Sequence, residues 1–302
     1  MHKRILFFLL MLCCFCGQAQ NQLHMQEWEN NLLTISAQIT STEALGDKDK
    51  ANASFIKTLS KALHEPYSFN YPFNALKKVS HIYAPDSSFR IFSWQVIYGD
   101  GQYRKFGAIQ MNSKDGALKL YPLFDVSAFS VNPSDSIRSA NNWIGAVYYR
   151  IILKQYNNQN YYTLLGYDAN NESSTKKWIE VLTFNSKNEP VFGGNFFDYH
   201  PEKIKPKPPV YRFSLEYKKD AGVRLSYNAT KDMIVFDHLI YENDIPTDGY
   251  SNLIPDGDYE GFKWQKGKWV QVVKVDNFKL NDGEAPTPHP LSDKEDIFQG
   301  MQ

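Results

Sequence analysis

The sequence predicts an α+β protein in which an N-terminal helical hairpin packs on a large antiparallel β-sheet or sandwich. Apolar residues recur every three to four positions between residues 23 and 64, as expected for amphipathic helices. From about residue 80 the period changes to two, and short turns separate the apolar runs. Short turns join antiparallel neighbours, because parallel strands need a long crossover. A small, propeller-like all-β fold is the alternative, although four blades would need ~16 strands.

The first nineteen residues have the three parts of an export signal. A basic start is followed by the apolar residues 5–15, and Gly17 and Ala19 place small residues before an expected cleavage at about Gln20. The apolar run is shorter than the ~20 residues that span a bilayer. The sequence therefore predicts a signal peptide at 1–19 and an exported protein, periplasmic or extracellular, without a transmembrane segment in the mature chain.

Cysteine and charge content exclude several classes of function. Cys13, Cys14 and Cys16 are the only cysteines and lie in the signal, so the mature protein would have no disulfide and no cysteine nucleophile. The residues before them fit a lipoprotein signal poorly. The chain has 33 basic and 33 acidic residues, and loss of Lys3 and Arg4 leaves 31 against 33. This balance predicts no basic face for nucleic acid and no polybasic patch for anionic lipid.

Two helices are expected before the strands begin. Residues 23–40 carry one apolar face, and a second helix is expected from about Asp47 to His64, ended by Pro66. About a dozen strands should follow, and the run 143–153 is apolar on both faces, which places it between two layers. The expected strands are 88–97, 102–111, 117–121, 143–155, 161–166, 177–184, 211–217, 223–227, 233–238, 262–264 and 269–275.

These patterns divide the chain into consecutive segments. The helical hairpin takes residues 20–66, an antiparallel β region 67–200, and a C-terminal β region 210–280. Between the β regions, residues 201–209 contain four prolines and three lysines, which predicts an extended connection. Residues 281–302 are expected to form a flexible tail, because they combine prolines with many charges.

Several strand and turn motifs resemble one group of proteins in combination. They lie at 147–152, 161–168, 177–184, 190–193, 233–239 and 261–270, and together span about half of the chain. In this pattern the sequence resembles an uncharacterised family of exported proteins from Bacteroidota. The resemblance implies a location in, or outside, a Gram-negative envelope. It implies no activity and no functional residue.

A short acidic segment is the one candidate metal site. Asp256, Asp258 and Glu260 alternate before a glycine, like the start of an oxygen-rich calcium loop. The twelfth position of such a loop should be glutamate, but here it is Gly267, and the segment runs directly into a strand. A solvated turn is therefore favoured, with a calcium site bounded by strands as the alternative. No other cofactor is expected.

A second candidate site lies around the hairpin at residues 157–160. Tyr161, Tyr167, Asp168, Asn170 and Asn171 combine aromatic rings, which stack on sugars, with groups that satisfy hydroxyls. The same residues serve equally as cross-strand aromatics and turn formers. Ordinary sheet and turn roles are favoured, and glycan binding is the alternative.

The sequence names no catalytic residue. It has neither a Gly-x-Ser-x-Gly elbow nor a His-Glu-x-x-His pair. Asp237 and His238 are adjacent in an expected strand, so their side chains should point to opposite faces. The favoured hypothesis is a non-catalytic envelope or extracellular protein that binds a glycan or another protein. The alternatives are a hydrolase acting on polysaccharide or peptide, and a structural envelope component.

Overall fold

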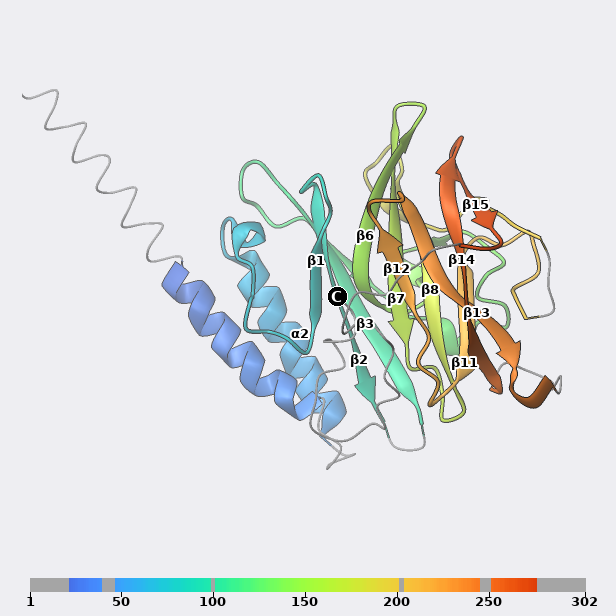
Figure 1. Ribbon diagram of the computed structural model, residues 1–302. Coiled ribbons are helices and arrows are strands. Elements are labelled where there is room, and N and C mark those ends of the chain that lie inside the picture. Colours follow the sequence, from blue (N-terminus) through green and yellow to red (C-terminus); the bar gives the residue numbers. More distant parts are fainter. Residues whose placement is uncertain (1–21, 40–46, 99–100, 201–203, 245–250, 276–302) are drawn as a thin grey trace, which may run out of the picture.

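The computed structural model describes residues 22–39, 47–98, 101–200, 204–244 and 251–275. They form four stacked layers: a pair of helices, a helix-side sheet, a central sheet and an outer sheet (Figure 1). The α+β class and the antiparallel sheets are thereby confirmed. The strands form open, stacked sheets and not blades around an axis, so the propeller alternative is wrong. No described helix combines the length and the apolarity needed to cross a membrane.

The helical layer consists of a helix over residues 22–39 and α2 (Lys48–His64). In the first helix, Met25, Leu32 and Ile39 are buried at seven-residue intervals, which is two helical turns. In α2, Phe55 and Leu59 face the same core and contact the helix-side sheet. Both predicted helices are confirmed. The segment between them, residues 40–46, lies outside the described residues.

The helix-side sheet has the order β1-β2-β3-β4. Its strands are β1 (Ser80–Tyr83), β2 (Phe89–Ile97), β3 (Tyr103–Met111) and β4 (Leu120–Leu123). Side chains of β2 alternate between two cores, with Phe92 and Trp94 toward the helices and Phe89 and Ile91 toward the central sheet. The predicted hairpin between β2 and β3 is confirmed.

A buried arginine ties the loop after α2 to this sheet. The Arg90 guanidinium is fully buried and donates to the carbonyls of Ser68 and Tyr71 at 2.8 and 2.6 Å. It also donates to Gln110 and to the Tyr83 hydroxyl, both at 2.8 Å. Four aromatic rings surround it, with ring centroids 4.7 to 5.6 Å from the guanidinium carbon.

The central sheet is covered on both sides. It contains β5 (Arg138–Ser139), β6 (Val147–Tyr156), β7 (Gln159–Asp168), β8 (Ser174–Phe184), β9 (Pro190–Phe192) and β11 (Phe213–Lys218). Adjacent residues of one strand enter different cores: Leu164 faces the helix-side sheet, and Leu165 faces the outer sheet. The prediction that 143–153 lies between two layers is thus correct for its strand, β6, because Ile151 and Ile152 divide in the same way.

The outer sheet has the order β10-β15-β14-β13-β12. Its strands are β10 (Phe197–Asp198), β12 (Leu225–Asn228), β13 (Met233–Tyr241), β14 (Leu253–Gln265) and β15 (Lys268–Val272). Short 3-10 turns connect other strands at Ser127–Phe129, Ala140–Asn142 and Glu242–Asp244. The acidic segment predicted as a turn or calcium loop lies inside β14. The pairing of β14 with β13 shifts at this segment, and Gly257, at φ +97°, accommodates the local irregularity.

The chain exchanges strands between two sheets around residues 201–209. β10, before this connection, pairs in parallel with β15 of the outer sheet. β11, after the connection, pairs with β8 of the central sheet. The two predicted β regions, 67–200 and 210–280, therefore each contribute a strand to a sheet built mainly by the other.

Candidate functional site

The residues predicted to bind glycan separate along one strand. Tyr161 lies near the hairpin end of β7, where its ring packs against Phe196 and Trp264 at 5.4 and 5.3 Å between centroids. Tyr167 and Asp168 lie at the other end of β7. Six residues of extended strand correspond to about 20 Å, so Tyr161 belongs to a different region from the other four.

At the far end of β7, Asp168 joins two layers. Its carboxylate is buried and lies 2.7 Å from the ammonium of Lys105, which comes from β3 of the helix-side sheet. It also accepts the backbone N–H of Asn170 at 2.8 Å. Burial raises the pKa of the neighbouring Tyr167 to about 12. Asp168 therefore forms an ion pair that joins the central sheet to the helix-side sheet.

The two asparagines after β7 build the turn into β8. The Asn171 carbonyl accepts the backbone N–H groups of Ser173 and Ser174, each at 2.8 Å. The Asn170 amide donates to the Ser174 hydroxyl at 2.7 Å and to Glu216 at 2.9 Å. Their side chains thus hydrogen-bond within the protein, as the turn interpretation predicts.

Two carboxylates of the predicted calcium segment pair with basic side chains of the protein. Glu260 is buried and accepts two hydrogen bonds from the Lys205 ammonium, at 2.8 and 2.7 Å. Asp256 lies 2.7 Å from Nδ1 of His238, and its carboxylate also accepts the backbone N–H of Asp258 at 3.0 Å. Within the described chain, no group of three His, Cys, Asp or Glu side chains could hold a metal ion. The calcium site stays a prediction.

A second polar pair involves β8 and β13. Burial raises the pKa of Asp237 to about 6, even though its carboxylate accepts the backbone N–H of Arg224 at 2.6 Å. Burial lowers the pKa of Lys177 to about 8. The Lys177 ammonium lies 5.9 Å from the centroid of the Tyr149 ring. Such shifts are common at functional sites, but they also occur in structural ion pairs.

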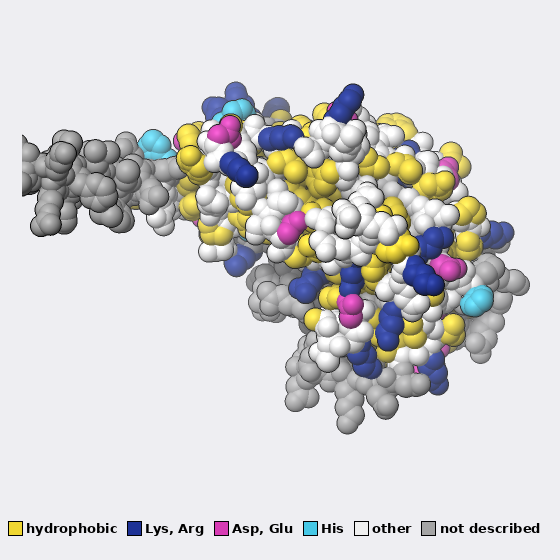
Figure 2. Space-filling model, turned by 90° about the horizontal axis from the view of Figure 1, so that it is seen from above, with side chains coloured by type: hydrophobic (Ala, Val, Ile, Leu, Met, Phe, Trp, Pro, Cys, Tyr) yellow, Lys and Arg dark blue, Asp and Glu magenta, His cyan; other side chains and the backbone are white. Residues whose placement is uncertain are grey.

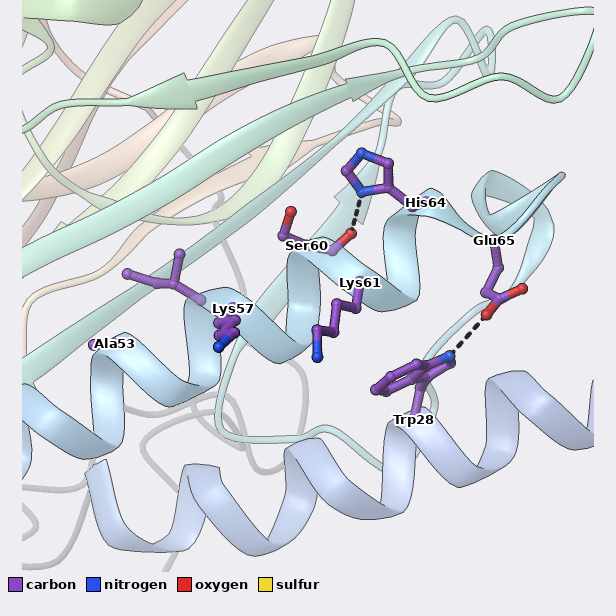
Figure 3. A pocket seen from close by; sticks show the side chains of 8 residues that line it. Trp28, Ala53, Lys57, Ser60, Lys61, His64 and Glu65 are labelled. Atoms are coloured by element: carbon purple, nitrogen blue, oxygen red, sulfur yellow. Dashed lines mark hydrogen bonds between the residues drawn. The ribbon is translucent and has the colours of Figure 1, made fainter.

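The helical hairpin carries an open groove on its outer side (Figure 3). The groove has a volume of about 880 Å³ but is shallow, so it does not enclose a small ligand as a deep pocket would. Its apolar part comes from Trp28, Ala53 and Ile56, and its basic part from Lys57, Lys61 and His64. In Figure 3, Lys57 and Lys61 point from α2 toward the first helix, while Trp28 rises toward α2.

One hydrogen bond fixes the aromatic side chain of this groove. The Trp28 indole N–H donates to the Glu65 carboxylate at 3.0 Å, which joins the first helix to the end of α2. The His64 ring lies 2.7 Å from the carbonyl of Ser60. By contrast, the ammonium groups of Lys57 and Lys61 form no ion pair with any described residue. The groove therefore presents the fixed Trp28 side chain beside the ammonium groups of Lys57 and Lys61.

Two residues with helical apolar spacing are exposed in the structure. The spacing of the first helix groups Leu23 and Trp28 with its core residues; Trp28 is half-buried against that core, but Leu23 is 62% exposed. The spacing of α2 groups Ile56 with Phe55, but Ile56 is 42% exposed. Ile56 lies 100° around the helix from Phe55, and this angle is the signal that could have identified it.

Charges elsewhere are mixed. On the face seen in Figure 2, Lys and Arg side chains lie among apolar and acidic ones.

The chain was compared with known proteins in three ways. Protein-family models, curated proteins and solved structures all gave no match. The resemblance to exported Bacteroidota proteins accordingly stays a prediction, and the site can be interpreted only from its own chemistry.

Proposed function

We propose that this is an exported, non-catalytic binding protein of the envelope or the extracellular space, and that its ligand is a segment of another protein. The observation that carries the proposal is the groove of the helical hairpin, where Trp28 and Ile56 lie beside Lys57 and Lys61, which form no ion pair with a described residue. An aromatic anchor with polar groups at its rim is typical of protein interfaces.

A catalytic role receives less support from the carboxylates. A glycosidase needs two carboxyl groups facing a shared substrate cleft. Asp168, Glu180 and Glu260 are buried, and each already pairs with a cation at 2.7 Å, namely Lys105, Arg212 and Lys205. Such pairs are suited to holding layers together.

A protein ligand also fits the groove better than a glycan does. Sugar sites combine exposed aromatic faces with amide or carboxylate groups that hydrogen-bond hydroxyls. The groove has one aromatic residue, and its only carboxylate, Glu65, already accepts a hydrogen bond from that residue. Apolar surface and ammonium groups instead favour an amphipathic, acidic segment.

The spacing on α2 indicates how such a segment would be arranged. Lys57, Lys61 and His64 lie at i, i+4 and i+7 on one stripe of the helix. Ala53 and Ile56 form an adjacent apolar stripe. A partner helix with carboxylates at the same spacing and leucines beside them would match both stripes, in the helix-in-groove mode of recognition.

The test is a titration of the full mature chain with a labelled, designed amphipathic helix carrying Glu at i, i+4 and i+7 beside Leu. Fluorescence anisotropy should show binding. The charge reversals Lys57→Glu and Lys61→Glu together should weaken it at least tenfold, and Ile56→Asn should weaken it independently.

The matched control is Lys50→Glu, which reverses an exposed charge on the same helix outside the groove. It should leave binding within twofold of the wild type. Equal binding of a Lys-for-Glu version of the peptide, or equal loss in the Lys50 variant, would contradict the proposed groove.

A further inference from the structure

A second surface lies far along the chain, in the loop between β4 and β5. Phe129 is 87% exposed and Val131 is completely exposed, while Phe124 and Ile137 are each more than half exposed. Four large apolar side chains within fourteen residues is a concentration that folded proteins normally avoid unless the surface makes contact with something.

The tip of this loop carries no charge. Residues 126–134 contain only apolar, hydroxyl and amide side chains and one proline, and Asp125 and Asp135 mark its two ends. Within the tip, Phe129 lies four residues from Asp125 and Val131 lies four residues from Asp135, the nearest charged residues in sequence.

The polar side chains of the tip bond within the loop. The Ser127 hydroxyl donates to the Asp125 carboxylate, and the Ser130 hydroxyl donates to the carbonyl of Val126 at 3.2 Å. The Asn132 carbonyl accepts the backbone N–H of Ser134 at 3.2 Å.

Several backbone groups of the tip are also paired. Phe129 N–H donates to the carbonyl of Val126 at 3.0 Å, and Ser130 N–H donates to the carbonyl of Ser127 at 3.2 Å. A segment that enters an apolar medium must satisfy its polar groups internally, because water is absent there. Contact with a protein, which supplies its own hydrogen-bonding groups, makes no such demand.

Hydrogen bonds hold both ends of the loop. At its start, the Asp125 carboxylate accepts the backbone N–H groups of Ser127 and Gly145 at 2.9 and 3.0 Å. At its end, the buried Arg212 guanidinium donates to the carbonyls of Pro133 and Ser136, and Tyr211 N–H donates to the carbonyl of Ser134 at 2.9 Å. The apolar tip is therefore presented by a supported loop.

We propose that this loop inserts its tip, Phe129 and Val131, into the interface of a lipid bilayer. The tip is uncharged and apolar, and several of its polar groups are hydrogen-bonded internally, so it suits the boundary between headgroups and acyl chains. The contact is shallow and reversible. It is independent of anionic lipid, since the tip carries no basic residue.

The experiment is flotation of the full mature chain with vesicles of phosphatidylcholine alone, and with vesicles containing about one-third phosphatidylglycerol. The wild type should float with both, and 0.5 M salt should not release it. The double variant Phe129→Ser, Val131→Ser should partition at least tenfold more weakly. Far-UV circular dichroism confirms that it is folded.

The matched control is Val273→Ser, which removes an apolar side chain that is 62% exposed elsewhere on the surface. It should float like the wild type, and so should the groove variant Lys57→Glu, Lys61→Glu. No flotation of the wild type, equal flotation of the double variant, or binding only to phosphatidylglycerol vesicles would overturn the proposal. Concentration-dependent dimers that the double variant abolishes, without vesicle binding, would overturn it in favour of a second copy of the chain.

Discussion

Arg90 shows how a single charged residue can organise an apolar region. It has no acidic partner among its hydrogen bonds, and carbonyls, a hydroxyl and an amide satisfy it instead. Burial lowers the pKa of its guanidinium to about 10, so the side chain is still charged at neutral pH. Its planar fork reaches groups in four directions, which a lysine ammonium cannot do.

Replacing this residue should therefore be costly even when the charge is kept. We expect Arg90→Lys and Arg90→Met each to lower the free energy of unfolding by about 3 kcal/mol, because buried carbonyls of Ser68 and Tyr71 lose their donors. Urea denaturation measures the change. Lys187→Met, at an exposed turn, is the control and should change stability by less than about 0.5 kcal/mol. A loss below about 1 kcal/mol in both Arg90 variants would contradict this role.

At the scale of the element, one strand shows both what sequence patterns predict and where they fail. The end of β14 and its turn into β15 follow the predicted hairpin, because tryptophan and apolar residues alternate there. The beginning of β14 was missed, since Asp256, Gly257 and Asp258 have low strand propensity. The residues on either side, Pro255 and Tyr259, pair with Leu239 and Asp237 of β13, so the strand continues through this segment because of a partner that the tertiary fold supplies.

A pH-dependent position lies beside the irregular pairing of β13 with β14. The pairing of β13 with β14 shifts between Asp237 and Leu239, and Asp237 is buried there. Burial raises the pKa of Asp237 from its ordinary value of 3.8 to about 6. Between these two pH values, Asp237 is protonated in the folded protein but ionised in the unfolded chain. This carboxyl group thus favours folding more at low pH, and that contribution is lost as the pH rises through 6.

The comparison of wild type with Asp237→Asn isolates this effect, since asparagine does not titrate. Between pH 7 and pH 5, the free energy of unfolding of the wild type should rise by about 1 kcal/mol relative to the variant. Urea denaturation of both proteins at the two pH values provides the four free energies of unfolding that the comparison needs. A difference between the proteins that is constant with pH would mean that the carboxyl group has an ordinary pKa.

At the scale of the whole molecule, the central sheet is the most protected layer. Its strands β7 and β8 are flanked by other strands, and both of their faces are covered by apolar cores. The helical pair covers one side of the helix-side sheet and has an exposed outer face. Native-state hydrogen exchange should therefore find the slowest amides in β7 and β8, and faster exchange in the helix over 22–39. Equal protection in both would show that the layers open only together.

The sequence predicts the layers better than their connections. Apolar residues on both faces of 143–153 were enough to predict a central strand, because a strand carries apolar residues on both faces when both faces are buried. Nothing in the local pattern shows that β10 pairs with β15, about seventy residues later, or that β11 pairs with β8. The candidate sites were harder to predict than the layers. Tyr161 and Asp168 are close in the sequence, but they lie toward opposite ends of β7.

The exchange of β10 and β11 also has a practical consequence for dividing the protein. If the chain were cut between residues 200 and 204, the N-terminal fragment would carry β10 without β15, and the C-terminal fragment would carry β11 without β8. Each fragment would hold a strand that completes a sheet of the other fragment. The pairing of β11 with β8 alone comprises six residue pairs. The two pieces should reassemble when mixed, which makes this connection a natural place to build a split reporter.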